Sequence, residues 1–253
     1  GSAAAILSLA LSTSAWPSPP TPHHHHPLFG AVSPASAAAA PPALSAAQLL
    51  SLEQAMRRIA SLCDPTFLSA VHQSGRFLYR GEPSIAPHGA DAAGATAAAA
   101  ILCPPPDLLV AGTYGEDDAA ALAYFQSLER TLARSPVKPS NGHIGVARRE
   151  AAASWGEAAS VWPIGQALHY CWPAARPDFW PMTGATTPSE SVNVDIGLSQ
   201  ALSLGREVLF ATRNRGSAPQ GEASSSCAGS AYIAISAELD AEVWTALQQW
   251  HIR

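Results

Sequence analysis

Residues 155–181 read WGEAASVWPIGQALHYCWPAARPDFWP, and this stretch decides the fold class. Three apolar segments within it each close on a Trp-Pro pair, at Trp162, Trp172 and Trp180. Short apolar runs with aromatic and β-branched residues, bounded by Gly and Pro, are typical of β-strands. Because tryptophan carries a very large apolar surface, the stretch predicts either a dense core or an exposed recognition face.

The rest of the chain alternates short strand-like runs with helical periodicity in an irregular order. Helices before and between strands, without a repeated β-α-β pattern, predict an α+β fold with one domain over residues 45–253. We expect short, mostly antiparallel strands with flanking helices, and mostly loop over the Ala/Pro/Gly-rich residues 82–107. A first helix is expected to follow a capping box formed by Ser45 and Gln48. The expected strands are 77–80, 108–111, 143–147, 160–163, 167–172, 207–212 and 231–236. Three further helices are expected: one at 116–134, one capped by Asp195 that runs to 204, and one that starts at 236.

The N-terminal segment differs in composition from everything after it. Residues 1–50 contain no Asp, Glu, Lys or Arg, and the first charged side chain is Glu53. Residues 3–12 form a ten-residue apolar run followed by small residues and then by Trp16. A run of that length suits a signal peptide and is too short to span a bilayer. Residues 1–44 therefore predict a targeting leader, with a low-complexity Ala/Pro/Ser tail as the alternative.

The leader resembles the two-part targeting sequences of algae whose plastids were acquired secondarily, in which an aromatic residue follows the signal cleavage site. Trp16 occupies that position here. The resemblance implies a plastid protein. A second small-residue site, Ala35-Ser36-Ala37, would suit onward import into the thylakoid lumen.

Composition also excludes several classes of protein and site. The chain of 253 residues has 14 basic and 19 acidic side chains and no basic run, which argues against nucleic acid as a partner. No stretch is long and apolar enough to predict a transmembrane span in the mature domain. The four cysteines are widely spaced and contain no Cys-x-x-Cys pair, so we expect no metal. They allow either two disulfides or four buried thiols.

Two strand-like segments carry a charge inside an apolar run. One is Phe77-Leu-Tyr-Arg80-Gly, and the other is Gly205-Arg-Glu207-Val-Leu-Phe. A buried charge without a partner is costly, so each residue needs an opposite charge or a ligand. An internal Arg–Glu pair or an exposed edge strand is one explanation, and a binding site is the other.

Together these segments resemble the ADP-ribosyltransferase family, whose catalytic fold begins with a strand carrying Tyr-Arg-Gly and ends with a glutamate directly before an apolar strand. The resemblance implies that Arg80 contacts the phosphates and ribose of NAD, the substrate, and that Glu207 is the catalytic glutamate. Between them the family has a Ser-Thr-Ser strand and a short helix ending in an aromatic residue. Residues 143–147 and 151–155 match that layout, although Gly145-Val-Ala lacks the hydroxyl groups.

The resemblance leaves two functions open. In the first, the protein cleaves NAD and transfers ADP-ribose, with Trp155 or Trp162 stacked on the nicotinamide ring. In the second, it is a non-catalytic plastid protein that docks on a photosynthetic or other assembly through its Trp-Pro segment. The first function requires Arg80 and Glu207 to face one cleft.

Overall fold

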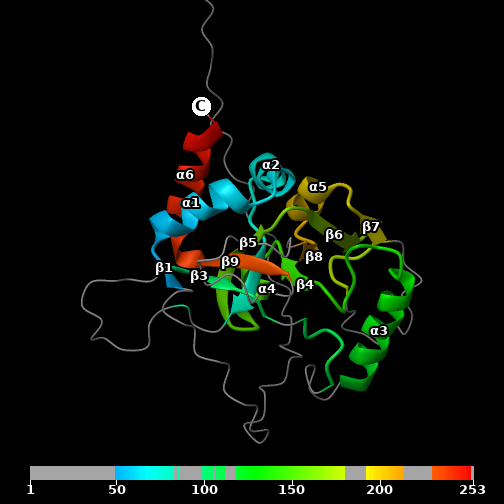
Figure 1. Cartoon of the computed structure of the whole chain (residues 1–253). Helices are drawn as coiled ribbons and strands as arrows, with labels where there is room; N and C mark the ends of the chain where they lie inside the picture. Colours follow the sequence, from blue (N-terminus) through cyan, green and yellow to red (C-terminus); the bar gives the residue numbers. More distant parts are fainter. Residues whose placement is uncertain are drawn as a thin grey trace, which may run out of the picture.

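The described part of the chain is an α+β structure built on one antiparallel sheet (Figure 1). A computed structural model describes residues 49–82, 85, 98–104, 106–111, 118–179, 192–213 and 230–251. The sheet has nine strands in the order β1-β3-β9-β5-β2-β4-β8-β6-β7, and every neighbouring pair is antiparallel. The α+β class predicted from the sequence is therefore confirmed. The predicted leader lies outside the described residues, as do Trp180 and Cys227.

The elements have the following bounds. The strands are β1 (Leu49–Leu50), β2 (Tyr79–Glu82), β3 (Ala99–Leu102), β4 (His143–Val146), β5 (Glu157–Ile164), β6 (Leu168–Pro173), β7 (Val192–Val194), β8 (Glu207–Thr212) and β9 (Ala231–Ser236). The α-helices are α1 (Leu52–Leu62), α2 (Pro65–Ser74), α3 (Asp118–Thr131), α4 (Arg149–Ala153), α5 (Leu198–Ser203) and α6 (Asp240–His251), and a 3₁₀ turn, Ala237–Leu239, precedes α6. Among the described helices, none has the length and apolarity needed to cross a membrane.

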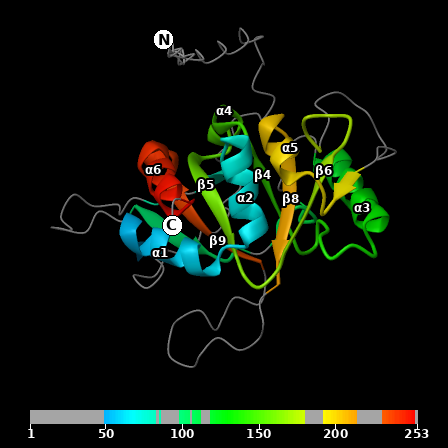
Figure 2. The same ribbon diagram turned by 90° about the horizontal axis from the view of Figure 1, so that it is seen from above.

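The helices group at three places along the sheet. Helices α1 and α6 lie side by side at one end, α2 and α5 pack on each other over the middle, and α3 lies at the other end (Figures 1 and 2). Trp162 of β5 is 1 % exposed and meets Phe67 of α2 and Phe77 edge-on, with ring centroids 5.8 and 5.5 Å away. These rings stand at the centre of the larger of two hydrophobic clusters.

The second hydrophobic cluster fixes α3 against β4, β8 and β6. Leu128 of α3 packs with Leu209 of β8 and Cys171 of β6, all at most 1 % exposed. Phe179, which follows β6, is fully buried in the same cluster. The Phe179 side chain thereby anchors the chain segment that enters the candidate site described below.

Most of the predicted strands occur close to their expected positions. Strands β8 and β9 have the predicted bounds, and β4, β5 and β6 differ from them by at most a few residues. Pro163 lies inside β5, where a proline would normally interrupt a central strand. It is tolerated because β2 pairs with β5 only as far as Tyr79–Ser160, so Pro163 is paired with Tyr232 of β9 alone.

Three local predictions were wrong. Residues 108–111 form a turn instead of a strand, with the Val110 amide donating to the carbonyl of Asp107. The expected loop contains β3, which pairs with β1 and β9. Gly197, not Asp195, caps α5, because the Asp195 carboxylate accepts from the Tyr170 amide at 2.8 Å instead. The predicted box at Ser45 and Gln48 lies outside the described residues, and a capping box is present at Ser51 and Gln54.

Strand β2 connects the two halves of the sheet unequally. Four residue pairs join β2 to β5, whereas a single pair, Tyr79–Val146, joins it to β4. The sheet therefore consists of two well-paired halves, β1-β3-β9-β5-β2 and β4-β8-β6-β7, which meet at a narrow backbone connection. We call this connection the β2–β4 joint.

Position 81, next to this joint, is a glycine because the surrounding backbone leaves no room for a side chain. A Cβ atom there would lie 2.6 Å from the Gly156 nitrogen and the Trp155 carbonyl carbon, and 2.7 Å from the Ala152 oxygen. All three atoms are backbone, so none can move aside cheaply. The glycine of the Tyr-Arg-Gly segment thus has a packing reason that involves no ligand.

Substitution of Gly81 tests this packing argument. We expect Gly81→Ala to lower the free energy of unfolding by about 3 kcal/mol or more, the upper range for overpacking a filled site. Gly75→Ala is the matched control, since Gly75 has open space around it and only a positive φ of 65°. That control should cost about 1–2 kcal/mol from backbone strain alone. Urea unfolding curves with equal losses for both variants would contradict the argument.

Candidate functional site

Arg80 belongs to a buried polar group that we call the Arg80 cluster: Arg80 and Glu82 of β2, Tyr232 of β9 and His143 of β4. The Arg80 Nε atom donates to Glu82 Oε1 at 3.1 Å, and the Arg80 side chain is 16 % exposed. The Tyr232 hydroxyl donates to the same Glu82 oxygen at 2.5 Å, and its ring centroid lies 5.8 Å from the guanidinium carbon. Burial opposes the charge of Arg80, but Tyr232, Glu82 and Asp107 outweigh it and raise the pKa of Arg80.

Arg80 also bonds across the β2–β4 joint. Its Nη1 atom donates to the carbonyl oxygen of Ile144 on β4 at 2.6 Å. The backbone ladder between the two strands contains only the Tyr79–Val146 pair. The guanidinium therefore adds a charge-assisted hydrogen bond where backbone pairing is missing, and such bonds are stronger than neutral ones.

His143 is the least satisfied member of the Arg80 cluster. Its side chain is 1 % exposed and lies 5.6 Å from the Tyr232 ring and 6.0 Å from the Phe210 ring. Within the described part of the chain, neither ring nitrogen makes a hydrogen bond of full geometry, although the Ser230 backbone lies near enough to act on the ring. Burial, assisted by the Arg80 charge and opposed by the Ser230 backbone, lowers the pKa of His143 to about 4. The imidazole is therefore neutral at physiological pH.

Glu207 opens β8 within a second group, the Glu207 cluster: Glu207, Arg148, Asp178 and Phe179. The Phe179 amide donates to Glu207 Oε2 at 2.7 Å, and Arg148 Nη2 donates to Asp178 Oδ1 at 2.5 Å. Burial first, and then the Asp178 charge, raise the pKa of Glu207 to about 8, against the Phe179 amide and Arg148. At neutral pH this carboxyl group is mostly protonated.

The strand register separates the two clusters. Tyr79 is paired with Val146, and Val146 with Glu207. Side chains of directly paired residues point to the same face of a sheet, and successive residues point to opposite faces. In a regular ladder through this single pair, the register places Glu207 on the face of Tyr79 and Arg80 on the other face. Strand β4 also lies between them, so the two residues that the sequence pairs are not brought together.

The two predicted stacking residues have different environments. Trp162 is a core residue whose Nε1 atom donates to Ser160 Oγ at 3.3 Å. Trp155, which follows α4, is 40 % exposed. Trp172 is 4 % exposed and donates to the carbonyl of Ile196. Among the described tryptophans of the Trp-Pro segment, Trp155 alone presents a large surface.

Several residues of both clusters were missed by the sequence analysis. Glu82 had a usable signal, because residues i and i+2 of a strand share a face and Glu82 follows Arg80 at that spacing. Tyr232 lies 150 residues from Glu82 along the chain, and Asp178 lies 30 from Arg148. No local spacing points to those pairs, since the strand order creates them.

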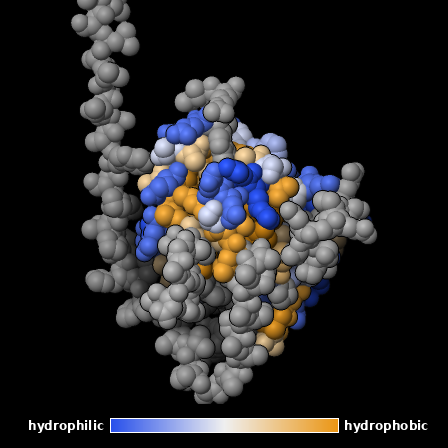
Figure 3. Space-filling model, turned by 60° about the vertical axis from the view of Figure 1, so that its left-hand side comes forward, coloured by the Kyte–Doolittle hydropathy of each residue, from blue (hydrophilic) through white to orange (hydrophobic). Residues whose placement is uncertain are grey.

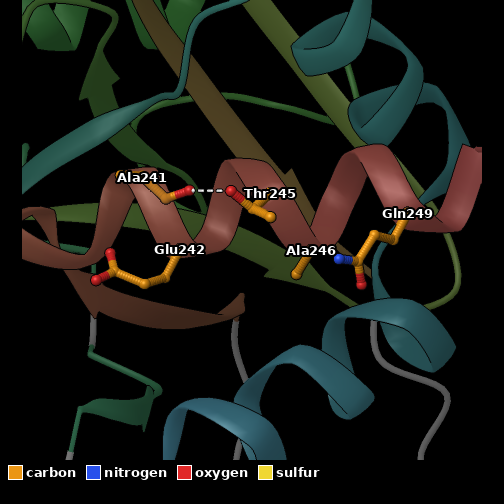
Figure 4. Close-up of a pocket in the computed structure, with 5 residues that line it drawn as sticks. All are labelled: Ala241, Glu242, Thr245, Ala246 and Gln249. Atoms are coloured by element: carbon orange, nitrogen blue, oxygen red, sulfur yellow. Dashed lines mark hydrogen bonds between the residues drawn. The ribbon is translucent and has the colours of Figure 1, made fainter.

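A shallow hollow of about 440 Å³ lies along α6 and shares no lining residue with either cluster (Figure 4). It is lined by Ala241, Glu242, Thr245, Ala246 and Gln249, all from this one helix. The Thr245 hydroxyl donates to the carbonyl of Ala241 at 2.9 Å, which leaves Glu242 and Gln249 as its other polar side chains. Such a lining provides no convergent reactive groups from separate elements.

The chain matches no protein-family model, no curated protein and no solved structure. Within the described ranges, no group of three or more His, Cys, Asp or Glu side chains is arranged to hold a metal ion. The geometry of the two clusters is therefore the main basis for a functional argument.

The Arg80–Glu82 pair can be tested by a double-mutant cycle. We expect Arg80→Met to lower the free energy of unfolding by about 3–5 kcal/mol, because it leaves the Glu82 carboxylate buried without its cation. Adding Glu82→Gln should recover at least about 1 kcal/mol of that loss, since the uncompensated charge is removed. Urea unfolding of the parent, both single variants and the double variant measures the coupling. Additive losses would show that the two side chains are energetically independent.

Proposed function

We propose that this protein is a non-catalytic ADP-ribosyltransferase-like protein of a plastid compartment that serves as a protein-docking module. The resemblance is supported by strand order: the segments that carry it lie on β2, β4 and β8, which are consecutive neighbours in the sheet. A short helix, α4, follows the middle segment and is succeeded by Trp155, as the resemblance implies. Adjacent strands allow the fold of the family without requiring its chemistry.

The non-catalytic part is supported by the strand register, from which we infer that Arg80 and Glu207 point to opposite faces of the sheet. A residue that holds NAD and a residue that stabilises its cleavage must both contact one bound molecule. Each residue instead has internal partners, Glu82 for Arg80 and the Phe179 amide for Glu207. A protonated Glu207 also lacks the negative charge that would stabilise an oxocarbenium-like transition state.

Strand β4 supplies a second argument against catalysis. Gly145 stands within the segment where the family carries hydroxyl groups, and a Cβ atom there would lie 2.6 Å from Leu78 Cγ. A serine at this position would not fit without displacement of Leu78, which is 1 % exposed. Loss of one transition-state hydrogen-bond donor typically reduces the rate by about 10²–10³-fold.

The compartment is supported by cysteine chemistry. Cys103 is disulfide-bonded, whereas Cys63 and Cys171 are free and buried. Disulfides persist mainly in oxidising compartments, and they are rare where thiols are kept reduced. This state agrees with export through a targeting leader, with the thylakoid lumen as the proposed destination and a photosynthetic complex as the proposed partner.

The docking surface is proposed around Trp155. It is a large aromatic side chain with 40 % exposure, and tryptophan is enriched among the residues that dominate binding energy. Figure 3 shows hydrophobic and hydrophilic surface side by side on the side of the molecule that lies at the left in Figure 1. Ile196 is another exposed apolar side chain, at 59 %, and provides a comparison outside the Trp-Pro segment.

The non-catalytic proposal is tested by incubating the full chain with millimolar NAD. We expect no release of nicotinamide above the buffer rate, because the register points Arg80 and Glu207 to opposite faces of the sheet. The same result is expected for Glu207→Gln. Chromatographic quantification of nicotinamide provides the measurement. Release by the parent chain that Glu207→Gln abolishes would show that the protein is an enzyme after all.

The docking proposal is tested by cross-linking the purified chain to a plastid extract. We expect a specific partner to be captured by the parent and by the control variant Ile196→Ser, and its yield to fall at least about tenfold with Trp155→Ser, the loss typical of an interface hot spot. Thermal unfolding confirms that both variants remain folded. Equal capture by all three chains would exclude Trp155 as the docking residue.

A further inference from the structure

Residues 177–179 lie against the start of β8 and are held at three successive positions, two of them by Glu207 and one by Arg148; we call them the strap. The Glu207 amide donates to the Pro177 carbonyl at 2.8 Å, and the Phe179 amide donates to Glu207 Oε2 at 2.7 Å. Between them, Asp178 accepts from Arg148. The Phe179 ring is fully buried in the second hydrophobic cluster. Backbone, side-chain and apolar contacts of the strap thus meet around one carboxyl group.

The charges around that carboxyl group are unbalanced. Two carboxyl groups, Glu207 and Asp178, stand beside a single guanidinium, that of Arg148. Asp178 is 28 % exposed and reaches solvent, whereas Glu207 is 8 % exposed. With Glu207 protonated, Arg148 and Asp178 neutralise each other. If Glu207 ionises, one negative charge has no cation.

Among the described residues, Asp178 and Arg148 are the charged groups that act on Glu207, and Arg176 lies two positions before Asp178 in the segment that leads into the strap. Strand β4 contains a single titratable side chain, His143, at its far end, and α5 contains none. Arg149 of α4 acts on Tyr79 and Asp240 instead, and Glu150 acts on Tyr79. Arg206 precedes Glu207 and therefore points to the opposite face of the strand.

We propose that the strap is a proton-dependent latch, fastened while the Glu207 carboxyl group holds its proton and loosened when that proton passes to solvent. No bond other than the O–H bond of Glu207 is broken. An ionised Glu207 would accept a stronger hydrogen bond from the Phe179 amide, but burial and the nearby Asp178 oppose the charge. Opening the strap relieves both effects, because water then reaches the carboxylate.

The direction of the pH effect follows from linkage. Burial and Asp178 raise the pKa of Glu207 from its ordinary value of 4.5 to about 8 with the strap closed. Between pH 4.5 and about 8, the closed form therefore holds a proton on Glu207 that the open form releases. Closure is most favourable at acid pH, weakens by up to about tenfold per pH unit as pH rises, and levels off above pH 8.

The test is hydrogen–deuterium exchange of the Phe179 amide in the full chain between pH 5.5 and 8.5, corrected for the intrinsic pH dependence of exchange. We expect protection of this amide to fall by up to about tenfold per pH unit and to level off near pH 8. Glu207→Gln keeps a carbonyl oxygen for the Phe179 amide and cannot ionise, so its protection should not change with pH. Glu242→Gln, an exposed position on α6, is the matched control and should behave as the parent.

A second variant keeps the proposal testable if Glu207→Gln does not fold. Asp178→Asn removes the neighbouring negative charge, so the pH at which protection levels off should move below that of the parent. Constant protection in the parent over the whole range would overturn the latch. An unchanged pH dependence in Glu207→Gln would overturn it equally, because another group would then be responsible.

Discussion

The β2–β4 joint is the constraint on which the rest of the structure depends. One backbone pair, Tyr79–Val146, and one guanidinium bond from Arg80 to the Ile144 carbonyl hold together two halves of a sheet that are otherwise well paired. The register of that single pair decides which face the side chains of β4, β8, β6 and β7 occupy relative to those of β2. A shift of one residue would move Glu207 to the face of Arg80. The separation of the two clusters is thus a consequence of the joint.

Local sequence predicted elements well where apolar runs have clear ends. The run at 207–212 starts after Gly205, whose φ of 69° ends the α5 segment, and the run at 231–236 stops at Ser236, which caps the next turn. Strand β3 was missed because Ala99–Leu102 follows an alanine-rich stretch whose composition resembles a loop. Its strand character comes from pairing with β9, and such tertiary context overrides propensity.

The sequence was sufficient to identify the charged residues of the candidate site, but not to predict which partners they have. Arg80 and Glu207 were identified because a charge inside an apolar strand needs a partner, and each has one in the structure. The family resemblance implied one shared partner, a bound NAD molecule, and an internal Arg–Glu pair was the alternative, which the Arg80–Glu82 contact matches. Two separate internal partners were found instead, because strand faces follow from register, which spacing along the chain does not specify. Tyr232, the remote member of the Arg80 cluster, shows the same limit.

The buried neutral His143 and the buried protonated Glu207 have opposite effects on the acid–base balance of folding. On unfolding, His143 gains a proton between its lowered pKa of about 4 and its ordinary 6.5, while Glu207 loses one between 4.5 and about 8. Over the shared range, near pH 4.5–6.5, the two exchanges cancel, so this pair adds no net pH dependence to stability. At mildly acidic pH, the proton that one buried group gains on unfolding therefore balances the proton that the other loses.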